Sequence, residues 1–174
     1  STLRMMFPEA YLGKVDEKAY IEKTNKTIKE YLSSGVLVDE GECFILVDRK
    51  TSVVDRRLGL VIAIDLEDYT YEKGVKSLIR ASEATIVERI PPRLKIRENA
   101  DIELPHILFL YDDKDRAINE ELYKHRSELE KVYDFDLMQK GGHASGWLIP
   151  ESDQAEILKA LDGLADITEF NKKY

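Results

Sequence analysis

The chain has 174 residues, 43% of them apolar and 34% charged, and a net charge of 26 − 34 = −8. This composition fits a globular protein with one hydrophobic core and excludes an intrinsically disordered chain. No apolar run approaches the ~20 residues that span a bilayer, and residues 1–4 do not resemble a signal peptide, so no membrane association is expected. The single cysteine, Cys43, excludes an internal disulfide and favours a reducing, cytoplasmic location.

The first half of the chain predicts one helix and one antiparallel pair of strands. A helix is expected over residues 16–32, where apolar side chains recur at helical spacing, and Gly35 is placed to end it. Two short apolar runs rich in β-branched residues, at 44–47 and 58–64, predict strands. Their short connection favours antiparallel pairing.

The second half predicts helices and strands without a strict alternation. Helices are expected at 81–90, 117–133, after Pro150 and after Asp166, and strands at 94–97, 107–111 and 147–149. Pro91 and Pro92 are expected to end the first of these helices. Asp166 and Glu169 form a possible capping box. This mixture predicts a single α+β domain over residues 1–174, with a mixed, largely antiparallel sheet and helices packed against it.

No familiar enzyme motif is present. The chain has neither a phosphate-binding glycine loop nor a dinucleotide fingerprint, and it has no paired metal-binding histidines on a helix. The stretch 142–146 holds a histidine and a serine, but it is not the nucleophile elbow of a hydrolase.

A basic cluster between residues 80 and 97 is the main anomaly in charge. It carries five positive and two negative residues, a local charge of +3 in an acidic chain. The candidate anion-binding residues are Arg80, Arg89, Arg93, Lys95, Arg97 and His106. On a strand, residues 93, 95 and 97 would share one face, which suits a phosphate or carboxylate. The alternative is that these side chains pair with the protein's own carboxylates.

Histidines and acidic residues supply the other candidates. His143 follows two glycines and is a candidate proton-transfer or anion-binding residue, or a turn residue before a strand. His125, on the apolar stripe of the 117–133 helix, is expected in the core. Asp112, Asp113 and Asp115 could hold a magnesium ion, but a solvated turn with a helix cap is the simpler interpretation, and no metal site is predicted. Cys43 is expected to be a small core residue.

Several stretches resemble a bacterial family known as domain of unknown function 1015. They are residues 77–85, 88–100 and 103–107, the sequence YDFDLM at 133–138 and the sequence GGH at 141–143. Family members are about twice as long and carry a later Asp-Gly-Asn-His or Asp-Gly-His-His motif, so the resemblance implies that this chain is an internal fragment. That motif is similar to one in ParB-like free-serine kinases.

The resemblance therefore implies a phosphotransfer or phosphoserine-related enzyme of amino-acid metabolism that binds a small anionic molecule. The full-length protein would use a nucleotide and Mg²⁺. His143 and Glu83 would be the catalytic residues, and the basic cluster would hold phosphate oxygens. The alternative is a non-catalytic module that binds a metabolite or, as in ParB-like proteins, nucleic acid. Nucleic acid is the less favoured partner because the chain is acidic.

Overall fold

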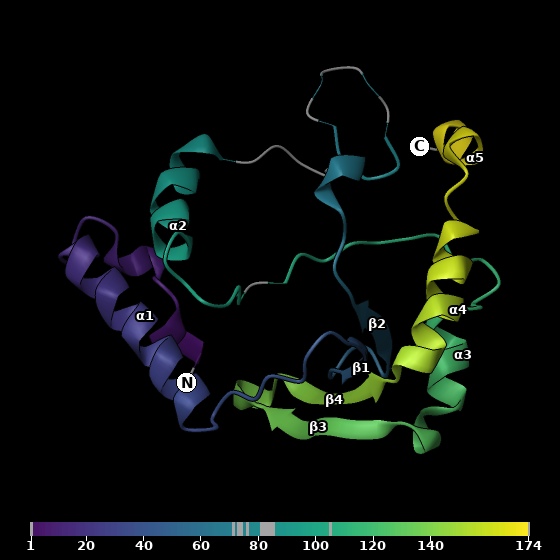
Figure 1. Ribbon diagram of the computed structural model, residues 1–174, viewed down its shortest axis with the longest axis horizontal. Helices are drawn as coiled ribbons and strands as arrows, with labels where there is room; N and C mark the ends of the chain where they lie inside the picture. Colours follow the sequence, from purple (N-terminus) through teal and green to yellow (C-terminus); the bar gives the residue numbers. More distant parts are fainter. Residues whose placement is uncertain are drawn as a thin grey trace. The chain divides into compact units, whose positions relative to one another are not determined.

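The computed structural model describes residues 2–70, 72, 75, 77–80, 86–104 and 106–173, and it leaves undescribed the side chains of Thr2, Glu9, Arg89 and Pro92. These residues form helices and a four-stranded antiparallel sheet (Figure 1), which confirms the predicted α+β class. The chain divides into two compact units. We call residues 1–40 and 82–110 the helical unit, and residues 41–81 and 111–174 the sheet unit.

The helical unit is built on helix α1, Glu17–Ser33, in agreement with the prediction. Asp16 caps its first turn by accepting a hydrogen bond from the backbone N–H of Ala19 at 3.2 Å. Thr24 and Ile28, one turn apart, are its buried residues. Gly35, with a φ of +73°, follows the C-cap. Short 3₁₀ turns lie at Thr2–Met5, Glu9–Tyr11 and Val87–Arg89.

Helix α2, Ile90–Arg97, lies where the sequence predicted a strand at 94–97. That prediction is wrong, and so is the expectation that Pro91 and Pro92 end a helix. The two prolines stand in the first turn, where backbone N–H groups have no partner inside the helix, so their missing N–H costs nothing. Of the helix predicted at 81–90, residues 81–85 lie outside the described residues, residues 87–89 form the 3₁₀ turn, and Ile90 begins α2.

The sheet unit contains strands β1 (Phe44–Lys50), β2 (Arg57–Val61), β3 (Glu130–Leu137) and β4 (Gly142–Ile149). Their order across the sheet is β2-β1-β4-β3, and each neighbouring pair is antiparallel. The predicted β1–β2 hairpin is confirmed. The strand predicted at 147–149 is the end of the longer strand β4.

Helices α3 (Asn119–Lys124), α4 (Glu151–Asp162) and α5 (Ile167–Lys173) complete this unit, with 3₁₀ turns at Leu66–Asp68, Arg126–Glu128 and Met138–Lys140. The core joins one face of the sheet to α3 and α4. Its buried residues are Leu46, Ile118, Trp147, Ile149 and Ile157. Asp166 caps α5 by accepting from the backbone N–H groups of Thr168 and Glu169, as its sequence pattern predicted.

Two further predictions in this unit are wrong. The helix expected over 117–133 ends at Lys124, and the chain from Glu130 onward is strand β3. Pairing with β4 favours the strand, because residues 133–137 alternate in the period of two that a sheet requires. Residues 107–111 are exposed and belong to no strand, since they have no neighbouring strand with which to pair.

None of the helices among the described residues is both long enough and apolar enough to cross a membrane.

Candidate functional site

The sheet face that packs on the core becomes polar toward one end. Leu46 of β1 lies opposite Trp147 of β4, and both are buried in the core. Two residues further along the same strands, Asp48 lies opposite Ser145, and after two more, Lys50 lies opposite His143. Directly opposed residues, and residues two apart on a strand, share a face. The polar side chains therefore continue the apolar core on one surface.

Strand β3 adds two carboxylates to that surface. Asp134 lies opposite Ser145, and Asp136 lies opposite His143. We call these five residues the polar end of the sheet: Asp48, Asp134, Asp136, His143 and Ser145.

Gly142 positions this group by letting β4 begin close against β1. Its φ is +98°, a conformation that side chains rarely adopt. A Cβ atom built on it would lie 1.8 Å from the carbonyl oxygen of Lys50. Only glycine fits there, so the close approach that brings His143 beside β1 depends on it.

His143 is held between two carboxylates. Its Nδ1 lies 2.8 Å from Oδ1 of Asp136, and its Nε2 lies 2.5 Å from Oδ1 of Asp134. The hydrogen bonds to Asp136 and then to Asp134 raise the pKa of His143, because both carboxylates favour the charged imidazolium. The side chain keeps 39% of its surface exposed, so a ligand can reach it.

Asp134 is the centre of the group. Its Oδ2 accepts a hydrogen bond from Nζ of Lys131 at 2.5 Å, and its Oδ1 accepts one from Oγ of Ser145 at 3.3 Å as well as from His143. The hydrogen bond from Lys131, followed by that from His143, lowers the pKa of Asp134. Both shifts favour an ionised Asp134 beside a protonated His143.

Three cations contact aromatic rings, and two of them also contact the polar end: Arg56 lies near Asp48, and Lys131 donates to Asp134. The guanidinium carbon of Arg56 lies 4.1 Å from the ring centre of Tyr123, and that of Arg126 lies 3.9 Å from it. The rings of Tyr123 and Trp147 pack edge to face, with 6.0 Å between their centres. Nζ of Lys131 lies 5.6 Å from the centre of the Trp147 ring. We call Arg56, Arg126 and Lys131 the cation group.

Asp48 of the polar end lies next to Arg56 of the cation group, and one of its carboxylate oxygens accepts no hydrogen bond from a described residue. Its Oδ2 lies 3.6 Å from Nε of Arg56, while its side chain is only 18% exposed. Its Oδ1 is buried, and none of the described residues gives it a hydrogen bond. A buried carboxylate oxygen without a donor is costly, so a ligand N–H or O–H group would be favoured beside it.

The arrangement thus combines carboxylates that can bind a positive group, cations that can bind a negative group, and a histidine that carries a proton. It does not form a metal site: no described group of three or more acidic, cysteine or histidine side chains is placed to hold a metal ion. The described residues thus offer no such cluster to a magnesium ion. The magnesium and nucleotide implied by the family resemblance enter no step below.

The predicted basic cluster lies mainly on α2, where the helix separates its members. Arg93 and Arg97 are one turn apart and share a face, while Lys95 lies on another, which corrects the strand-based prediction that all three align. Arg97 pairs with Glu103 at 2.8 Å, and Lys95 lies 3.8 Å from Glu17. The carboxylate pairing weighed as an alternative therefore holds for Lys95 and Arg97.

The other predicted residues do not belong to α2. Arg80, in the sheet unit, hydrogen-bonds to Asn171 and to the carbonyl of Ser77 and stacks 4.5 Å above Phe170, which fixes it against α5. His106 is exposed in an irregular segment. Glu83 and the Arg89 side chain lie outside the described parts, so their predicted roles stay predictions.

Three minor predictions can be compared with the structure. His125 is not a core residue: its side chain is 60% exposed beside Glu121 and Glu128, because α3 ends there. Asp113 is a helix cap, accepting from the backbone N–H groups of Ala117 and Ile118, each at 3.0 Å. Cys43 is half-buried immediately before β1.

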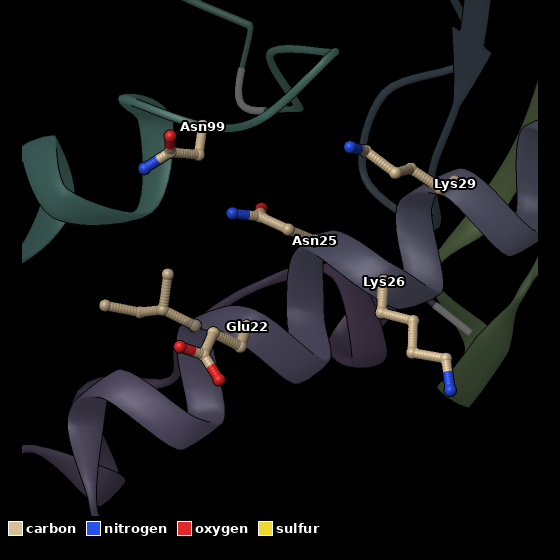
Figure 2. A pocket seen from close by; sticks show the side chains of 6 residues that line it. Glu22, Asn25, Lys26, Lys29 and Asn99 are labelled. Carbon is tan, nitrogen blue, oxygen red and sulfur yellow. The ribbon is translucent and has the colours of Figure 1, made fainter.

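The helical unit carries a separate hollow of about 500 Å³. The residues that line it are Ile21, Glu22, Asn25, Lys26, Lys29 and Asn99 (Figure 2). Oδ1 of Asn25 is buried without a hydrogen bond from any residue that the structure describes. This hollow lacks the proton-carrying histidine of the polar end, so the polar end is the stronger candidate site.

Sequence reasoning found His143 but missed its carboxylate partners. The signal was present, because Asp134 and Asp136 alternate in a stretch that also carries the family resemblance. The predicted helix ended at residue 133 and the residues after it were assigned to no strand, so their position opposite His143 was missed.

No curated protein and no solved structure matches this chain. One family model matches it, over residues 1–168, and its description is that of a protein of unknown function, DUF1015. The match spans both units and includes every residue of the polar end. The chain therefore belongs to the DUF1015 family.

Proposed function

We propose that this chain binds a small anionic amino-acid metabolite, for which phosphoserine is the test ligand, in phosphotransfer or phosphoserine-related chemistry in the cytoplasm. The observation that supports this most is His143, which two carboxylates hold in its charged form at an exposed end of the sheet. A proton held at a reachable position is what a general acid requires.

The charges around His143 suit a ligand that carries both signs. An α-ammonium group would supply the donor that Oδ1 of Asp48 lacks, and it would be attracted by Asp134. A phosphate would bind to the cation group, because arginine forks match phosphate oxygens in pairs. Phosphoserine offers both groups within one small molecule.

The polar end also offers one group that can accept a proton and another that can donate one. Ionised Asp134 can accept the proton of a serine hydroxyl as that oxygen bonds to phosphorus, and protonated His143 can donate to the oxygen that leaves phosphorus. In the reverse direction the two groups exchange these roles. The neighbouring cations would stabilise the charge on the phosphoryl oxygens.

Calorimetric titration of the chain with phosphoserine, serine and inorganic phosphate tests the binding. We expect phosphoserine to bind more tightly than either of the others, and Arg126→Gln and Asp48→Asn each to weaken it roughly tenfold. Arg116→Gln, an exposed arginine of the same unit, is the matched control and should bind as the unaltered chain does. Equal weakening in that control would contradict the proposed site.

A turnover assay separates enzyme from binding module. The chain and the full-length protein that carries it would be incubated with serine, nucleotide and magnesium, and separately with phosphoserine. Phosphate exchange that His143→Gln lowers at least tenfold supports the enzymatic proposal. Phosphoserine binding without turnover in either protein would favour the non-catalytic module.

A further inference from the structure

A second basic feature lies on the opposite face of the same sheet. Arg49 of β1 and Arg57 of β2 are directly opposed in the antiparallel register. Both are exposed, and neither forms an ion pair within the part of the chain that the structure describes. Like charges directly opposite each other destabilise a sheet, so this pair is unfavourable without a partner.

The alternation along β1 separates this pair from the polar end. Asp48 and Lys50 face the polar end, so Arg49 between them points to the other side of the sheet. Opposed residues have Cβ atoms about 5 Å apart, so two guanidinium groups can reach one oxyanion.

Gly59 leaves the β2 side of the sheet open beside the pair. Gly59, two residues from Arg57, shares its face, and no atom lies within 4 Å of where a Cβ on Gly59 would stand. Ala144, opposite Arg49, again presents a small side chain. Val47 also shares this face, opposite Gly59, and Ala144 is buried, so the open space beside the arginines lies over Gly59 of β2.

We propose that Arg49 and Arg57 form a binding site for a phosphate group, separate from the polar end. The two positive charges of the arginines match the two negative charges of a phosphate monoester. A ligand with a single carboxylate would neutralise only one of the two arginines. The bound phosphate replaces the repulsion between the arginines with attraction to both. The site uses neither His143 nor the cation group, so it does not depend on the proposed function.

Titration of ¹⁵N-labelled chain with inorganic phosphate, followed by NMR, tests this site. We expect the amide signals of Arg49, Arg57 and Gly59 to shift together, and Arg49→Gln and Arg57→Gln each to weaken that binding roughly tenfold. Arg116→Gln serves as the control and should leave the affinity unchanged. Acetate, with a single charge, should bind at least tenfold more weakly than phosphate.

The variant Arg57→Glu gives a second test, which measures stability and does not require the affinity of the wild-type protein for phosphate. This variant places a glutamate opposite Arg49, so the two side chains attract each other. Its melting temperature without ligand should therefore be higher than that of the wild type. Added phosphate should not raise the melting temperature of this variant further, because the binding site is lost. Phosphate shifts confined to the polar end, acetate binding as tight as phosphate binding, or a melting temperature that Arg57→Glu lowers would each overturn the proposal.

Discussion

The two ends of strand β4 share one face of the sheet and differ in what covers them. At one end, Trp147 and Ile149 pack against α3 and α4 and are nearly or fully buried. At the other end, His143 keeps a substantial exposed surface and its neighbours are carboxylates. One strand thus supplies both the core and the candidate site, because residues of α3 and α4 pack against only one of its ends.

The difference shows why chemistry is concentrated at the uncovered end. A carboxylate under the helices would lose its hydration without gaining partners, so that end accepts only apolar side chains. Beyond the helices, Asp134 and Asp136 stay partly hydrated and can hold a charged histidine. Substitutions at either end of the strand, or in the segment that caps α3 over the covered end, test this difference.

The largest expected effect is at the covered end. Ile149 is fully buried, so Ile149→Ala should lower the free energy of unfolding by on the order of 4 kcal/mol, since it removes buried methyl groups and leaves a cavity. Ser145→Ala, on the same strand and face, should cost about 1 kcal/mol, the value of one hydrogen bond. Urea denaturation measures both. Equal losses would mean that the two ends are not distinct.

Gly142→Ala should cost roughly 3 kcal/mol, because its Cβ would strike the Lys50 carbonyl and its φ is unfavourable for alanine. Gly59→Ala in β2 is the matched control: its Cβ would meet open space, so the change should stay within about 1 kcal/mol. Thermal melting compares the two variants. A Gly142→Ala protein as stable as Gly59→Ala would show that β1 and β4 do not approach so closely.

Asp113→Ala should weaken the helix that covers the apolar end. Its carboxylate accepts two backbone N–H groups just before α3, so its loss should cost about 1 kcal/mol. Asp115→Ala, an exposed neighbour in the same turn, should cost less than about 0.5 kcal/mol. If Asp115→Ala is the more harmful change, the capping role assigned to Asp113 is wrong.

The smallest expected effect is a pH dependence at the polar end. The raised pKa of His143 gives stability that is full below about pH 6.5 and is lost as pH rises through the folded-state pKa. The lowered pKa of Asp134 gives stability that is full above about pH 3.8 and is lost as pH falls through its folded-state pKa. The stability difference between the wild type and His143→Gln should therefore be greatest between about pH 4 and 6.5.

Denaturation of both proteins across that range measures this difference. Asp136→Asn should reduce this difference, because the hydrogen bond that His143 donates to Asp136 is the main cause of the raised pKa of His143. A difference that grows as pH rises above 7 would contradict the carboxylate pairing.

Much of the fold could be predicted from the sequence where local signals agree with tertiary pairing. Helix α1 has both helical periodicity and a cap, and the β1–β2 hairpin has two β-branched runs with a short link. The errors arose where local signals were ambiguous. Leu129 and Val132 fit a helical stripe, but pairing with β4 places the chain from Glu130 in a strand.

The candidate site was harder to predict for the same physical reason. Asp134 and Asp136 lie nine and seven residues before His143, and only the antiparallel register brings them together. The arginines between residues 80 and 97 are close together along the chain, but closeness in sequence does not by itself bring charges together in space. Arg56 and Arg126, by contrast, meet on Tyr123 from distant positions.

An NMR titration with phosphoserine, observed at the His143 ring and at the Ile149 methyl groups, tests the central claim most directly. The account predicts that saturating phosphoserine shifts the His143 signals and leaves those of Ile149 in place, since the ligand binds at the uncovered end of the strand. Binding that leaves the His143 ring unchanged, or no binding at millimolar concentration, would contradict it.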